Sequence, residues 1–269
     1  MSNRREPTGP LTVADVRLGE PYELSEGRLV QCAPTGGRGS RANLIGGAVL
    51  GFDPAVTSAG VDTAISPDPG TLRAPDVAVG NVPNLPGVVR VAPPLAVEYA
   101  DTGQDEVELR KKIAEFFAAG TKYVWVVRLS GRPRVDVHEP GLPVRAALPG
   151  SELVAPGVLK NPVKVEALYD RDAAMEATLR SLLQRRGYES LTEVREEGRE
   201  EGREEGREEG RAEALGSALL AVAAARGLTL TEADRALVAS CRDGARLEEA
   251  IRRAATGDAS AIVAALEAR

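Results

Sequence analysis

The sequence predicts an α/β fold with a mixed sheet flanked by helices, followed by a long charged helix and a small helical tail. All nine Phe, Trp and Tyr residues lie between positions 22 and 188, which indicates where the packed domain ends. Between residues 95 and 129, an apolar segment, a helical pattern and a second apolar segment follow one another, as in a crossover between parallel strands. Four Glu-Glu-Gly-Arg repeats occupy residues 196–211. We therefore expect a domain over 12–170, a long helix over 171–226 and a helical tail over 227–269.

The composition excludes several classes of protein. The 269 residues include 34 Lys and Arg, 40 Asp and Glu, two Cys and one His, with a net charge of −6. No apolar run is long enough to span a bilayer, and the first residues lack the apolar core of a secretory signal, so we expect a cytoplasmic protein without membrane contact. A single His excludes a His-rich zinc site. Any bound metal must then be held by carboxylate oxygens, which favours Mg²⁺ or Mn²⁺.

Short apolar segments bounded by Gly, Pro and Asp predict the strands. In chain order these segments are 22–31 (a hairpin), 55–66, 74–79, 95–100, 123–129 and 134–138.

Helical periodicity is clearest over residues 105–119, where Leu109, Ile113 and Phe116 repeat at helical spacing and Gly120 follows. Residues 42–50 predict a shorter helix that contains two glycines. The preceding glycine-rich residues 36–40 predict a flexible loop, because they lack the Gly-Lys-Ser/Thr ending of a phosphate-binding loop.

The region after residue 170 predicts helices throughout. The Glu-Glu-Gly-Arg repeat precesses around a helix and leaves no fixed apolar stripe, so it cannot form a coiled-coil seam. We interpret it as a solvated spacer rather than a specific binding site. Three short helices are expected over 232–240, 247–255 and 259–268, and they suit either a small module or a homo-oligomer contact.

Three charged residues occupy positions where strand and helix patterns favour apolar ones. Val77 and Val79 share one face of their strand, so Asp76 lies on the other. In the next strand Glu98 projects between two alanines, opposite Leu95, Val97 and Tyr99. Lys112 follows Leu109 by three residues and therefore faces the sheet.

Two carboxylates with a neighbouring lysine suit metal-dependent cleavage of a phosphodiester. Asp76 and Glu98 would bind Mg²⁺ or Mn²⁺, which activates water, and Lys112 would orient or polarise that water. The alternative is structural: Asp76 binds backbone at its strand end, Glu98 pairs with Lys112, and no reaction occurs.

Five blocks in order resemble the bacterial putative restriction endonuclease family of the PD-(D/E)XK nuclease superfamily, across residues 12–170. The resemblance implies a restriction-endonuclease-like fold, in which Asp76 and Glu98 bind the metal, Lys112 completes the site and Glu23 assists. The blocks are YELSEGRLV (22–30), RAPDVAV (73–79), PLAVEY (94–99), KIAEFFAAG (112–120) and YVWVV (123–127).

The leading hypothesis is therefore a metal-dependent DNA endonuclease. Residues 1–170 contain 18 basic and 20 acidic residues, so charge alone neither favours nor excludes DNA. A local basic patch from Arg38, Arg41, Arg73 and Arg110 would favour it. The alternative from another class is a catalytically inactive nuclease fold that serves as a binding or assembly module, with the helical tail driving self-association.

Overall fold

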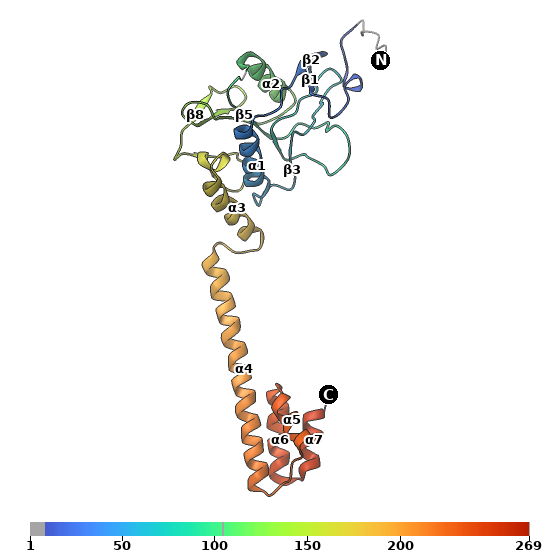
Figure 1. Ribbon diagram of the computed structural model, residues 1–269, viewed down its shortest axis with the longest axis vertical. Coiled ribbons are helices and arrows are strands. Elements are labelled where there is room, and N and C mark those ends of the chain that lie inside the picture. Colours follow the sequence, from blue (N-terminus) through green and yellow to red (C-terminus); the bar gives the residue numbers. More distant parts are fainter. Residues whose placement is uncertain (1–8, 104, 269) are drawn as a thin grey trace. The chain divides into compact units, whose positions relative to one another are not determined.

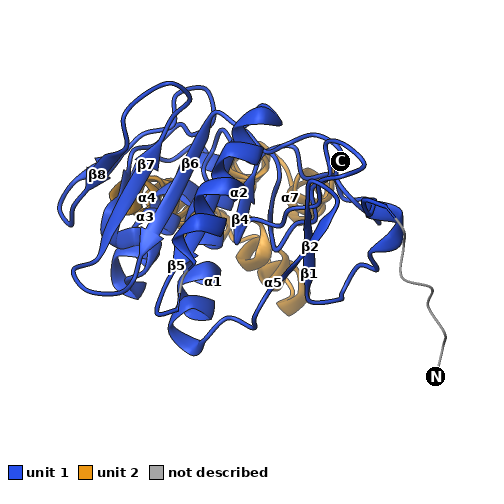
Figure 2. Cartoon of the chain, turned by 90° about the horizontal axis from the view of Figure 1, so that it is seen from above, with its two compact units in different colours: residues 1–190 blue, residues 191–269 orange. Residues whose placement is uncertain are grey.

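The computed structural model describes residues 9–103 and 105–268. The chain divides into two compact units, residues 1–190 and 191–269 (Figure 2). Each unit has its own apolar core. In the part of the chain that is described, no helix has the length and apolarity needed to cross a membrane.

A six-stranded mixed sheet forms the centre of the first unit, in the order β3-β4-β5-β6-β7-β8. Only β5 and β6 pair in parallel, and α2 (Glu106–Ala118) connects them, which confirms the predicted crossover. The other neighbouring strands are antiparallel. The strands are β3 (Ala59–Val61), β4 (Val77–Val79), β5 (Leu95–Ala100), β6 (Tyr123–Arg128), β7 (Arg134–His138) and β8 (Arg145–Ala147).

Two small antiparallel ribbons and short helices complete this unit (Figure 1). The ribbons pair β1 (Tyr22–Ser25) with β2 (Arg28–Gln31), as the hairpin prediction required, and β9 (Glu152–Leu153) with β10 (Val163–Lys164). The remaining helices are α1 (Gly37–Gly51), α3 (Arg171–Arg185) and the 3-10 turns η1 (Val13–Asp15) and η2 (Val165–Leu168).

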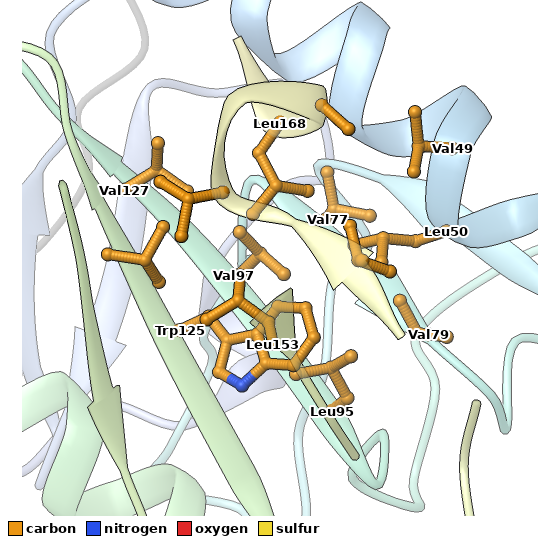
Figure 3. Packing of buried hydrophobic residues seen from close by; sticks show 14 of the residues in the cluster. Val49, Leu50, Val77, Val79, Leu95, Val97, Trp125, Val127, Leu153 and Leu168 are labelled. Carbon is orange, nitrogen blue, oxygen red and sulfur yellow. The ribbon is translucent and has the colours of Figure 1, made fainter. Parts of the chain in front are cut away.

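Both faces of the sheet are covered, and this explains why nearly all side chains of β5 and β6 are apolar, Glu98 and Arg128 being the charged exceptions. On one face Val97 and the fully buried Trp125 pack against Leu50 of α1 and Leu168 of η2 (Figure 3). On the other face small side chains of β5 lie under α2. This second cluster comprises Ala96, Ala100, Leu109, Ile113, Phe116, Val124 and Val126.

The predicted loop over 36–40 is wrong, because α1 begins at Gly37 and runs to Gly51. Tertiary packing explains the glycines of this helix. A Cβ on Gly46 would lie only 1.8 Å from the Tyr99 hydroxyl oxygen, so a glycine lets α1 approach the sheet closely. The helix therefore owes its position to packing more than to intrinsic propensity.

Two predicted strands are shorter than expected. Within the segment 55–66 only Ala59–Val61 forms a strand of the sheet, because Asp62, which follows directly, has a positive φ of 49° that takes the chain out of the extended region. Ile65 makes only isolated bridges, to Arg73 and Val89. The segment 74–79 pairs only from Val77, since Pro75 has no N–H to donate to a ladder.

The single helix predicted over 171–226 is also wrong. Gly187, with φ of 91°, lies in the break between α3 and α4 (Leu191–Ala225). The second half of α4 packs with α5 (Glu232–Ser240), α6 (Gly244–Thr256) and α7 (Ala259–Glu267) around the core of the second unit. Every residue from 191 to 211 is exposed, as the spacer interpretation requires.

Candidate active site

Asp76 and Glu98 are brought together by the pairing of β4 with β5. Val77 lies opposite Val97 in this antiparallel pair, so Asp76, one residue before β4, comes opposite Glu98. The backbone N–H of Tyr99 donates to Asp76 Oδ2 at 2.6 Å. The register of two strands thus places two carboxylates side by side.

Lys112 reaches these strands from α2. Asp105 caps the helix by accepting from the N–H groups of Val107 and Glu108, which fixes where the helix begins. The Lys112 ammonium lies 2.9 Å from Glu98 Oε1 and 3.1 Å from Glu98 Oε2, and it donates to the carbonyl of Ala74 at 2.8 Å. The prediction that Lys112 faces the sheet is therefore confirmed in geometry.

Glu23, on β1, joins the same group. Its Oε1 lies 3.0 Å from Lys112 Nζ and accepts from the N–H of Ala74 at 3.0 Å, while its Oε2 lies 2.8 Å from Arg73 Nη1. Lys112 thus bridges Glu23 and Glu98, and all four residues predicted from the sequence meet at one place.

Arg73 does not belong to a basic surface patch. Its side chain is 2% exposed and forms ion pairs with Glu23, Glu108 and Glu115. It therefore cannot contact a DNA backbone as predicted. Instead, its ion pair with Glu23 holds that carboxylate in place. Arg38, another member of the predicted patch, is paired with Asp101.

Asn43 is a site neighbour that the sequence analysis missed. It is buried on α1, and its Nδ2 donates to Asp76 Oδ1 at 3.0 Å. Its own Oδ1 is buried without a hydrogen-bond partner in the described structure. A buried amide among apolar residues of a helix was the available signal, but only the tertiary fold identifies Asp76 as its partner.

Burial and charge set the protonation of the site. Burial raises the pKa of Glu98 to about 8, against the opposing effect of the nearby Lys112 ammonium. Burial also raises the pKa of Asp76, and the N–H of Tyr99 partly offsets this. For Lys112, burial lowers the pKa, but the carboxylates of Glu98 and Glu23 outweigh it and raise the pKa above the ordinary value. The raised pKa favours the ammonium form of Lys112.

A cavity of about 430 Å³ opens onto Glu23, Asp76 and Lys112, with Glu98 behind the lysine. Within residues 9–103 and 105–268, no group of three or more His, Cys, Asp or Glu side chains is arranged to hold a metal. Mg²⁺, however, keeps several waters and is commonly held by one or two carboxylates. Asp76 and Glu98, with the unpartnered oxygen of Asn43 nearby, are a donor set of that chemistry.

The chain is similar to known putative nucleases in sequence and in fold. Residues 14–161 match the sequence model of the Uma2 family, described as "Putative restriction endonuclease". A putative nuclease from Anabaena variabilis has a similar fold, with a TM-score of 0.52 and 18% identity, over 61% of this chain and 99% of that one. No curated protein matches the sequence.

Proposed function

Because this chain belongs to the Uma2 family of putative restriction endonucleases, we propose that it is a DNA endonuclease that hydrolyses phosphodiester bonds with Mg²⁺ or Mn²⁺. One observation carries the metal-dependent mechanism. Asp76 and Glu98 are opposite one another on neighbouring strands, and a lysine from α2 lies within 3 Å of Glu98. Of the proposed site residues, all but Glu98 line the cavity of about 430 Å³.

In this mechanism Asp76 and Glu98 hold the metal. When bound, the metal supplies an activated water and stabilises negative charge on the scissile phosphate. Asp76 is already oriented by the backbone of β5, so little side-chain freedom is lost on binding. The excess of carboxylates over cations around the cavity favours capture of a divalent cation.

Lys112 contributes as a charged hydrogen-bond donor. Its ammonium now lies against Glu98, and in the working enzyme it donates to the attacking water or to the phosphate. Glu23 is a positioning residue. It holds the lysine from the other side and is itself fixed by Arg73.

The test is cleavage of supercoiled plasmid DNA with and without Mg²⁺ or Mn²⁺. Wild-type protein should nick or cut the plasmid only when the metal is present, and Glu98→Gln should lose at least about a hundredfold in rate. Asp136→Asn is the matched control, since Asp136 is also a buried sheet carboxylate, but on β7 and paired with Arg128 and Arg134.

Purifying the variants identically controls for contaminating nuclease, and circular dichroism establishes that each is folded. Equal cleavage by wild type and Glu98→Gln would exclude the proposed site. No cleavage of any DNA by the folded wild type would instead favour the alternative of a nuclease fold that acts as a binding or assembly module.

A further inference from the structure

An apolar stripe along α3 is exposed on the first unit. Met175, Leu179 and Leu182 are 60%, 42% and 41% exposed, and their spacing of four and three residues puts them on one face of the helix. Leu44 of the adjacent helix α1 is 72% exposed. Large apolar side chains gathered in this way indicate a surface that another protein covers.

These side chains line a long groove between α1 and α3, which pack against each other (Figure 1). One part, of about 710 Å³, extends along α3 from Arg171 and Asp172. A second part, of about 1110 Å³, lies mainly between α1 and β3, and Leu182, Arg185 and Arg186 at the end of α3 border it. Leu44, Ala48 and Leu182 line both parts, so the two parts adjoin, and the first follows α3 from Arg171 to Leu182.

Opposite charges mark the two ends of this stripe. Asp172 lies seven residues before Leu179 and Arg186 lies seven residues after it, so both share its side of the helix. Neither side chain forms an ion pair within the described chain. Arg185, in contrast, is occupied, because it donates to the carbonyls of Phe52, Asp53 and Val56.

We propose that the occupant of this groove is the α3 helix of a second copy of the chain, packed antiparallel about a two-fold axis at Leu179. In that arrangement Asp172 of each copy faces Arg186 of the other, and the charge pair forms twice. Met175 and Leu182 flank the axis and cover one another. Parallel packing would place Asp172 against Asp172 and Arg186 against Arg186, so charge selects the antiparallel dimer.

Analytical ultracentrifugation of the full-length protein tests the interface. The wild type should sediment as a dimer of a 28.3 kDa chain. Leu179→Glu puts two carboxylates at the axis and should give the monomer. Asp172→Arg and Arg186→Asp each create two repulsive contacts, and each should raise the dimer Kd by about tenfold or more.

The double variant Asp172→Arg/Arg186→Asp provides the decisive measurement, since it exchanges the charges and should restore the wild-type Kd. Arg110→Asp, on α2 at the other face of the sheet, is a charge-reversal control that should leave the mass unchanged. Because the substituted residues are exposed, each variant should keep the wild-type fold, and circular dichroism checks this. A monomeric wild type would overturn the proposal. So would a dimer that none of the α3 variants weakens, because association would then lie elsewhere, as in the helical tail.

Discussion

The side-chain amide of Asn43 donates a 3.0 Å hydrogen bond to Oδ1 of Asp76, while the backbone of β5 holds the other carboxylate oxygen. One helix and one strand therefore orient a single carboxylate from two sides. This relationship links α1, which carries none of the residues predicted to react, to the proposed metal site.

Asn43→Ala should weaken metal binding. Losing the donor frees Asp76 to rotate, and loss of such an outer partner commonly costs about 10–100-fold in metal affinity. Binding of Mn²⁺ measured by electron paramagnetic resonance, without DNA, checks this. Arg41→Ala, on the same helix but exposed, is the control. Unchanged Mn²⁺ affinity in Asn43→Ala would show that Asp76 needs no support from α1.

Lys112→Met should destabilise the fold as well as abolish cleavage. Removing one partner of a buried ion pair leaves the other uncompensated, at a cost of about 3–5 kcal/mol in unfolding free energy. Lys112→Met/Glu98→Gln should regain part of that stability in urea unfolding, although Glu23 still lacks its partner. A double variant less stable than the single one would contradict the inferred pairing.

Asp136→Asn should lower the unfolding temperature in a pH-dependent way. Burial raises the pKa of Asp136, but the guanidinium groups of Arg128 and Arg134 overcome this and lower it below the ordinary value of 3.8. A lowered pKa contributes stability above pH 3.8 that is lost as the pH falls through the folded value. The difference in unfolding temperature between Asp136→Asn and wild type should therefore be largest at pH 7 and become smaller as the pH falls below 3.8. A difference in unfolding temperature that does not change with pH would show that it does not come from the ionised Asp136 carboxylate.

Gly46→Ala and Gly198→Ala should change stability in opposite directions. At Gly46 a Cβ would collide with Tyr99, and overpacking of this kind costs about 1–3 kcal/mol. At Gly198, in the charged repeat, nothing lies within 4 Å, so alanine should stabilise α4 by up to about 1 kcal/mol.

Trp fluorescence and helical circular dichroism report the effects of Gly46→Ala and Gly198→Ala separately. Trp125, the single Trp, is buried in the first unit, so its fluorescence follows unfolding of that unit and should report the loss in Gly46→Ala. Helical circular dichroism should rise in Gly198→Ala. Stabilisation by Gly46→Ala would mean that α1 can move away from the sheet.

Periodicity in the sequence predicted the elements that position Glu98 and Lys112. The large apolar residues of β5 alternate along the strand and those of α2 recur at helical spacing, so Val97, Leu109 and Phe116 already indicated where Glu98 and Lys112 face. Local patterns failed where packing between distant segments decides the structure. Glycine-rich residues 36–40 resemble a loop although the first turn of α1 begins at Gly37, and Arg73 resembles a surface cation until three glutamates surround it.

The sequence by itself determined the mixed α/β class and the crossover between β5 and β6, and it predicted Asp76, Glu98 and Lys112 as site residues, because side-chain periodicity and residue chemistry are local properties. Glu23 was predicted only through the resemblance to the endonuclease family. Only the tertiary structure decided that Asp76 lies opposite Glu98, that Asn43 supports it and that Lys112 lies between Glu23 and Glu98. Those relationships depend on strand register and on contacts between residues far apart in the chain, and the energy of such contacts leaves no periodic pattern in the sequence.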